Sequence, residues 1–372
     1  MSDDHSMHIL YGVSADGNGH VARARALIPE LEKRGAKVTT LFSGSTSPIA
    51  IDASVFKNVI NRGGFTRSVE GAHVNMFKTV AANLMQLPKL AHEVLTMDLR
   101  PYDVVISDFE PVSAFSRRFR NLISGQHKPS IGIANQYAYE KGVPRAPGLL
   151  MGNAHNLALA KTRLGMHFHH FGKEGILPPF IADMPPASEP EEGKILVYLG
   201  FDNVDDIKTL LKPYEGYNFH VYSKQASEQT VEGHITINPI NREAFRKDFA
   251  DCEGVITGAG FMTPSEALYM GKKLLLKPMD GHPEQLSNAM ALEEMGAAHV
   301  MYDLDPKALD AFLHDDHAMQ IIYPDVVSPL ADWVAAGEYS RRSANMLCDD
   351  LWDKTDIHDD RIDPSSSSVD LG

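Results

Sequence analysis

The sequence predicts an α/β protein made of two doubly wound, Rossmann-like parallel-sheet domains that face each other across a cleft. Strand-like apolar runs alternate with helical segments between residues 7 and 175, and the alternation restarts between residues 194 and 300. Between these two runs, residues 176–193 are rich in proline, glutamate and serine, which is typical of a linker. A chain of 372 residues is long enough for two such domains.

The first domain, residues 1–175, is expected to begin with a buried strand and to alternate from there. The expected strands are residues 7–14, 36–44, 102–108 and 129–136. The expected helices are residues 21–35, closed by Gly35, and residues 112–123. Residues 77–99 are expected to form one or two helices, interrupted near Pro88. Strands that alternate with helices indicate a parallel sheet with crossover connections.

The second domain, residues 194–348, repeats this order without repeating the sequence. Its expected strands are residues 194–202, 218–224, 234–240, 253–260 and 272–279. Its expected helices are residues 202–214, 242–252, 262–271 and 282–296. The remaining residues, 349–372, are rich in aspartate and serine and are expected to form a loosely attached acidic tail.

The charge is unevenly distributed along the chain. The net charge of −14 argues against a general nucleic-acid binder. Residues 1–175 carry 20 basic and 14 acidic residues (+6), whereas the rest carries 15 and 35 (−20). This asymmetry suggests two domains with different partners. The alternative is that the acidic residues only keep the protein soluble and happen to lie in one half. The polar start, the lack of a membrane-length apolar run and only two cysteines favour a cytoplasmic protein.

A first glycine-rich turn follows the first strand. Gly17, Gly19 and Ala22 fit a relaxed dinucleotide-binding pattern, but no acidic residue follows the second strand to hold a ribose. The next residue of interest is His20, which starts a helix at the carboxyl edge of the predicted sheet. A helix N-terminus favours neutral imidazole, so His20 is a candidate general base, with a capping or surface histidine as the alternative.

A second glycine-rich turn lies between residues 255 and 300. Gly258, Ala259 and Gly260 allow a ligand to approach the backbone closely, and residues 263–265 open a helix whose free amides suit phosphate. Glu266, in the first turn of that helix, is placed to bind a sugar hydroxyl. Glu284 and Gln285 begin another helix that faces the same site. An ordinary capped strand–turn–helix is the alternative.

These motifs resemble those of the GT-B nucleotide-sugar glycosyltransferases, particularly the MurG-like and UDP-glucuronosyl-like groups. The matching positions are Gly17–His20, Gly258–Gly260, Ser265–Ala267, Gly271–Lys272, Gln285, Asn288 and Gly296–Ala298. A poorly characterised bacterial or archaeal subgroup is suggested by Ser107–Pro111 and Gln136. The resemblance implies transfer of a hexosyl group from a nucleotide sugar, expected to be a UDP-sugar, with inversion and without a metal or other cofactor.

The resemblance also implies roles for single residues. His20 would deprotonate the acceptor, Asp108 would orient His20, and Gly17, Asn18 and Gly19 would form the acceptor-side loop. The donor would be held at its diphosphate and ribose by Gly258, Ala259, Gly260, Phe261, Met262, Thr263 and Glu266, at its sugar by Glu284 and Gln285, and at its base by Ile240. One departure is Asp202, which stands in a loop that binds phosphate in many relatives and would repel a diphosphate. His167–His170 lack the partners that a metal site needs.

The acceptor is expected to bind the basic first domain, as it does in the family. Residues 76–90 and 148–168 combine leucine and methionine with basic residues, so helices there would rest on the inner face of an anionic membrane or face the core. The acceptor is expected to be a hydroxyl or lipid-linked compound, and a first domain that rests on a membrane would accept a lipid-linked sugar or a polyprenyl phosphate. The alternative functions are a non-hydrolysing UDP-sugar 2-epimerase and a non-catalytic donor-binding subunit.

Overall fold

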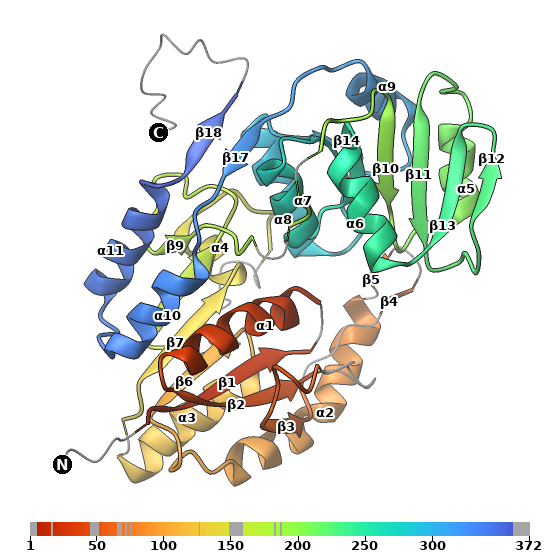
Figure 1. The fold of residues 1–372 in the computed structure, drawn as a ribbon. Helices are drawn as coiled ribbons and strands as arrows, with labels where there is room; N and C mark the ends of the chain where they lie inside the picture. Colours follow the sequence, from red (N-terminus) through yellow and green to blue (C-terminus); the bar gives the residue numbers. More distant parts are fainter. Residues whose placement is uncertain are drawn as a thin grey trace.

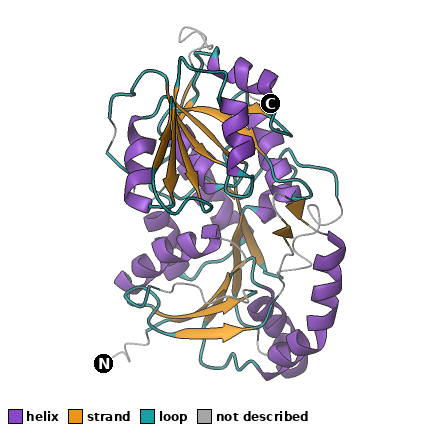
Figure 2. Cartoon of the chain, turned by 90° about the vertical axis from the view of Figure 1, so that its right-hand side faces the viewer, coloured by secondary structure: helices purple, strands orange, loops and turns teal. Residues whose placement is uncertain are grey.

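The computed structural model describes residues 6–15, 18–44, 52–64, 69–70, 73–74, 76–125, 127–148, 159–181, 184–186 and 188–359. Two large sheets dominate the fold, and each is flanked by helices (Figure 1). The view in Figure 2 shows one sheet above the other, with helices on both sides of the upper sheet. The predicted α/β class with two Rossmann-like domains is therefore confirmed.

The first sheet has seven parallel strands in the order β3-β2-β1-β6-β7-β8-β9. Its strands are β1 (His8–Ser14), β2 (Lys37–Ser43), β3 (Val59–Arg62), β6 (Val104–Asp108), β7 (Ser130–Ala134), β8 (Thr162–Met166) and β9 (Ile176–Leu177). Its helices are α1 (Asn18–Lys33), α2 (Met76–Thr96), α3 (Pro111–Ser124) and α4 (Gln136–Lys141). After β1 the chain adds β2 and β3 on one side of this strand, and it then adds β6 on the other side. The strand order therefore reverses between β1 and β6. A small hairpin joins β4 (Val69–Glu70) to β5 (His73–Val74).

The second sheet also has seven strands, in the order β12-β13-β11-β10-β14-β15-β16, and only β12 is antiparallel to its neighbour. Its strands are β10 (Lys194–Tyr198), β11 (Asn218–Ser223), β12 (Thr230–Glu232), β13 (Ile235–Pro239), β14 (Gly254–Gly258), β15 (Lys273–Lys277) and β16 (His299–Val300). Its helices are α5 (Val204–Leu211), α6 (Arg242–Asp251), α7 (Met262–Tyr269), α8 (Pro283–Glu294) and α9 (Pro306–Leu313). Here the order reverses between β10 and β14.

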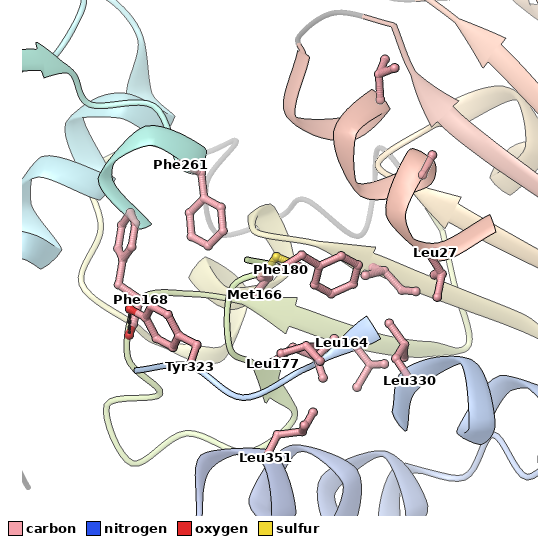
Figure 3. Close-up of a cluster of buried hydrophobic side chains, with 14 of the residues drawn as sticks. Leu27, Leu164, Met166, Phe168, Leu177, Phe180, Phe261, Tyr323, Leu330 and Leu351 are labelled. Atoms are coloured by element: carbon pink, nitrogen blue, oxygen red, sulfur yellow. Dashed lines mark hydrogen bonds between the residues drawn. The ribbon is translucent and has the colours of Figure 1, made fainter. Parts of the chain in front are cut away.

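The central strands form continuous apolar runs because helices cover both faces of each sheet. Residues 9–13 of β1 and all five residues of β6 and β7 are buried. A further cluster of buried side chains joins the two halves of the molecule (Figure 3). In this cluster Phe168, just after β8, packs against Phe261, just before α7, with ring centroids 4.8 Å apart.

The last part of the chain returns from the second sheet to the first. β17 (Gln320–Ile322) pairs with β18 (Asp356–His358), and between them lie α10 (Val327–Ala336) and α11 (Arg341–Trp352). Arg34, after α1, forms an ion pair with Asp332 of α10 at 2.6 Å. The Trp352 indole donates a hydrogen bond to the Ile176 carbonyl at 2.7 Å. α10 and α11 therefore attach to the first domain.

Three sequence expectations need correction. α2 runs without a break through Pro88. The described part of the segment 148–168 holds strand β8 rather than a helix, and residues 149–158 lie outside the described residues. Residues 349–358 are not a loose tail, because they complete α11 and form β18. Strand β9 also lies within the expected linker; the domain limits at 175 and 348 stay predictions.

Candidate functional site

A tight turn after β6 fixes the position of Asp108. The next residue, Phe109, has φ of +50°, a left-handed conformation that is unusual for a bulky side chain. Glu110 then caps α3, because its carboxylate accepts hydrogen bonds from the amides of Val112 at 2.6 Å and Ser113 at 2.7 Å. The turn therefore ends the strand and starts the helix within two residues, and it leaves Asp108 at the carboxyl edge of the sheet.

Asp108 binds two side chains of α1. Its Oδ1 lies 2.7 Å from Nδ1 of His20, and its two oxygens accept hydrogen bonds from Arg23 Nε at 2.8 Å and Arg23 Nη2 at 2.6 Å. His20 and Arg23 are one turn apart on the same helix face. Burial opposes the ionisation of Asp108, but the charge of Arg23 and the hydrogen bonds with His20 and Arg23 outweigh it and lower the pKa of this carboxyl. β1 and β6 flank the point where strand order reverses, which is where open α/β sheets bind ligands.

Two neighbours compete for Nδ1 of His20. This nitrogen lies 2.7 Å from both Asp108 Oδ1 and Arg23 Nη2, and each Nη atom of arginine carries two N–H groups. Nδ1 therefore either donates to Asp108 or accepts from Arg23, depending on the tautomer. In the tautomer in which Nδ1 donates to Asp108, Nε2 carries the lone pair of the neutral ring.

The second glycine turn ends at a helix whose N-terminus has no side-chain cap. β14 ends at Gly258, and α7 begins at Met262 after an uncapped Phe261. By contrast, α5, α6, α8 and α9 are each capped by a side chain, from Asn203, Asn241, His282 and Asp305 respectively. The amides at the start of α7 are therefore available to an anion.

Other residues predicted around this turn take specific positions. Glu266 stands in the second turn of α7, not the first. The Phe261 side chain is buried against Phe168, so this residue offers only its backbone to a ligand. A Cβ on Gly260 would meet nothing within 4 Å, which leaves space beside the backbone. Ala259 is buried, and its carbonyl accepts a hydrogen bond from Asn288 Nδ2 at 2.9 Å.

Glu284, at the start of α8, connects the two halves of the molecule. Its two carboxylate oxygens accept hydrogen bonds from Asn135 Nδ2 at 2.7 Å and from Gln136 Nε2 at 2.9 Å. Its neighbour Gln285 turns inward, where Oε1 accepts a hydrogen bond from the Met279 amide at 2.8 Å. Both residues expected to bind the donor sugar thus also hold protein groups in place.

Lys277 neutralises the carboxylate that appeared unsuited to a diphosphate site. Its ammonium lies 2.8 Å from Asp202 Oδ1, and both side chains are largely buried. Lys277 ends β15 and is the register partner of Gly258 on β14, while Asp202 follows β10. The expected repulsion at Asp202 is therefore compensated within the protein. The sequence signal for Lys277 was a lysine that ends a strand after three consecutive leucines.

The two glycine motifs lie close to each other. A Cβ built on Gly19 would lie 3.7 Å from Cγ of Met262. Ile240 follows β13 at the carboxyl edge of the second sheet, and 49% of its side chain is exposed. Gly17 lies outside the described residues, and of Asn18 only the backbone at the start of α1 is described.

Three residues of the site were not predicted from the sequence: Arg23, Asn135 and Lys277.

His167–His170 form part of an aromatic cluster beside Trp352. The ring centroid of Trp352 lies 5.8 Å from that of His169 and 5.2 Å from that of His170. Within the described ranges, no three histidine, cysteine, aspartate or glutamate side chains are grouped as metal ligands. In the same part of the chain, no helix has both the length and the apolar character needed to span a bilayer.

Comparison with known proteins gives a family and a fold. The profile of "Glycosyl transferase family 1" matches residues 7–315. The glycotransferase of kitacinnamycin is similar, with 12% identity, a TM-score of 0.57 and coverage of 93% of this chain and 99% of that chain. MurG of Acinetobacter baumannii has 16% identity, a TM-score of 0.54 and coverage of 93% and 99%. Spinosyn rhamnosyltransferase SpnG complexed with thymidine diphosphate has 13% identity, a TM-score of 0.54 and coverage of 93% and 96%. No curated protein sequence matches significantly.

Proposed function

The chain belongs to glycosyl transferase family 1, and from this premise we propose that it moves a sugar from a UDP-sugar to an acceptor hydroxyl with inversion at the anomeric carbon. It is a GT-B glycosyltransferase that uses a nucleotide donor. One observation carries the finer proposal: His20 is bound to Asp108 and follows Gly19, on which a Cβ would lie 3.7 Å from Cγ of Met262, the first residue of the uncapped helix α7.

The base in this proposal is Nε2 of His20. As the acceptor oxygen attacks the anomeric carbon, its proton moves to Nε2 and the bond to the diphosphate oxygen breaks. Asp108 accepts the Nδ1 hydrogen bond and stabilises the imidazolium that forms. Arg23 keeps the carboxylate ionised and fixed, so it is a positioning residue.

The leaving diphosphate gains negative charge, and two features of the second sheet suit it. The amides at the start of α7 and the positive end of its dipole face an anion there. Lys277 supplies a cation at the end of β15, beside Gly258. These groups would stabilise the leaving group without a metal. Glu266 and Ile240 stay proposed for the ribose and base, and Glu284 and Gln285 for the donor sugar.

The acceptor is proposed to be a lipid-linked hydroxyl reached at a membrane surface. Val80, Leu84 and Leu87 lie on one face of α2, at i, i+4 and i+7, and are 46–60% exposed, with Met85 84% exposed beside them. An apolar stripe of this kind on a helix suits the boundary between headgroups and acyl chains. The proposal therefore places the protein at the cytoplasmic face of a membrane.

The test uses His20→Ala and His20→Gln. Thermal-shift screening of nucleotide sugars first identifies the donor, because a ligand that binds only the folded state raises the melting temperature. Release of UDP in the presence of an acceptor then measures transfer. Loss of a general base lowers kcat by about 10²- to 10⁴-fold, while calorimetric UDP binding stays unchanged. Transfer that persists in both variants would refute the role of His20, and a screen without any shifting nucleotide sugar would refute the donor.

A further inference from the structure

A large basic cavity lies at the opposite end of the first sheet from His20 and Asp108. Its volume is about 960 Å³, and its lining includes Ser130 and Thr162, the first residues of β7 and β8. In a parallel sheet these residues mark the amino edge, about 16 Å along five-residue strands from the carboxyl edge. The other wall is formed by the loop before α11 and by its first turn. The cavity is thus separate from the proposed transfer site.

The lining of this cavity is strongly positive. Its lysine and arginine residues are Arg117, Lys128, Lys141, Lys161, Arg163 and Arg341, and His127 lies among them. No aspartate or glutamate lines it among the residues that the structure describes. Two of these cations form ion pairs with carboxylates outside the lining: Glu140 lies 3.5 Å from Arg163, and Glu174 lies 2.9 Å from Arg341. The lining itself therefore carries positive side chains without a carboxylate among its described residues.

The fold gathers these cations from distant parts of the sequence. They come from α3, from the segments leading into β7 and β8, from the end of α4 and from the start of α11. Their mutual repulsion costs free energy that surface lysines scattered in water avoid. Lys141 shows the effect: burial, followed by the charges of Arg163 and Arg341, lowers the pKa of its ammonium. Burial and the charge of Arg118 likewise lower the pKa of Arg117.

We propose that this cavity binds a small anion carrying two or more phosphate groups. Guanidinium groups bind phosphate oxygens in a planar, bidentate way, and lysines add point charges. The volume lies within the usual range for small-molecule sites, about 300–1,000 Å³. Such an anion would contact both the first sheet and α11, and it would relieve the repulsion between their cations. The phosphates belong either to a free polyphosphate compound or to a phosphorylated lipid headgroup, and the two arms of the test distinguish these sources.

The test measures binding of inorganic tripolyphosphate to the full-length protein by calorimetry, with UDP at saturation so that the proposed donor site is filled. The variant Lys161→Gln/Arg163→Gln removes two exposed cations at the start of β8. The control Lys33→Gln/Lys57→Gln removes the same charge from exposed lysines elsewhere. We expect one tripolyphosphate per chain, at least about tenfold weaker in the first variant and unchanged in the control.

A parallel arm uses vesicles that contain phosphatidylinositol bisphosphate. If Lys161→Gln/Arg163→Gln lowers cosedimentation with the vesicles and the control does not, the site binds a lipid headgroup. If the variant weakens tripolyphosphate binding but leaves cosedimentation unchanged, the site binds a free ligand. Either result supports the cavity as a phosphate site. Absence of binding in both arms, an equal loss in the control, or competition by UDP would overturn the proposal, and none of these bears on the role of His20.

Discussion

Arg23 holds both oxygens of the Asp108 carboxylate, at 2.8 Å from Nε and 2.6 Å from Nη2, although the two residues are 85 positions apart in the sequence. Both side chains are almost fully buried. A buried carboxylate that loses its cation keeps its desolvation cost, so removal of one partner of such a pair is strongly destabilising.

The variant Arg23→Met is therefore expected to lower the free energy of unfolding by about 3 kcal/mol, measured by urea denaturation. Asp108→Asn in the Arg23→Met background should recover part of this loss, because the neutral amide leaves no buried charge. A loss below about 1 kcal/mol in Arg23→Met would show that the pair contributes little.

The ion pair of Lys277 with Asp202 leads to a prediction about donor binding. Lys277→Met should weaken UDP binding by about tenfold, because one charge-assisted contact to phosphate is lost. Asp202→Asn should strengthen UDP binding, since the competing carboxylate is removed while the cation stays. The double variant avoids an unpaired buried charge and serves as the stability control. If all three variants bind UDP as tightly as the parent protein does, Lys277 and Asp202 are not part of the donor site.

Two buried histidines predict a loss of stability in mild acid. Burial lowers the pKa of His167 to about 3 and that of His169 to about 4, whereas an unfolded histidine titrates near about 6.5. The unfolded chain therefore binds more protons below about pH 6.5, and stability falls as the pH drops through this window. From pH 7 to pH 5 each residue should cost about 2 kcal/mol.

The measurement compares urea midpoints at pH 7 and pH 5 for the parent protein and His167→Phe. Phenylalanine keeps an aromatic ring beside Phe168 and Phe171 but takes up no proton. The variant should lose about 2 kcal/mol less than the parent between these pH values. Equal losses would mean that His167 does not titrate in the unfolding equilibrium.

The exposed apolar face of α2 predicts membrane binding that charge would weaken. Leu84→Glu/Met85→Glu should reduce cosedimentation with anionic vesicles severalfold, because it places two carboxylates where apolar contact is proposed. Met346→Glu, at a 61% exposed methionine on α11, is compared with the single variant Met85→Glu, so that each adds one carboxylate. A similar loss in the control would point to general charge repulsion, and no loss in either variant would contradict the role of α2.

The sequence predicted the elements whose apolar pattern is long and regular. β1, α1, β6 and the β14–α7 turn are found at the expected positions, because each has a clear period and a clear end signal. β8 was missed because Arg163 and Gly165 interrupt its short apolar run, and β9 was missed because two residues carry no period. α2 continues through Pro88, so this proline did not indicate a helix end.

The site was predictable only in part, for a geometric reason. His20 and Asp108 each stood out by their place after a strand, and the structure brings them into contact. Arg23 had no such signal, since its partner is known only once β1 and β6 are seen to be neighbours. Lys277 and Asn135 depend in the same way on pairings between distant segments. The roles of all these residues stay predictions.

The return of α10 and α11 to the first domain restricts how the second domain can move. The chain leaves the first sheet after Leu177 and comes back before Val327, so the second domain is tethered at two points instead of one. Figure 1 shows α10 and α11 beside α1 and the strands of the first sheet. A movement that separates the two sheets would therefore have to bend the chain at both crossings. It would also break the hydrogen bonds that Glu284 accepts from Asn135 and Gln136.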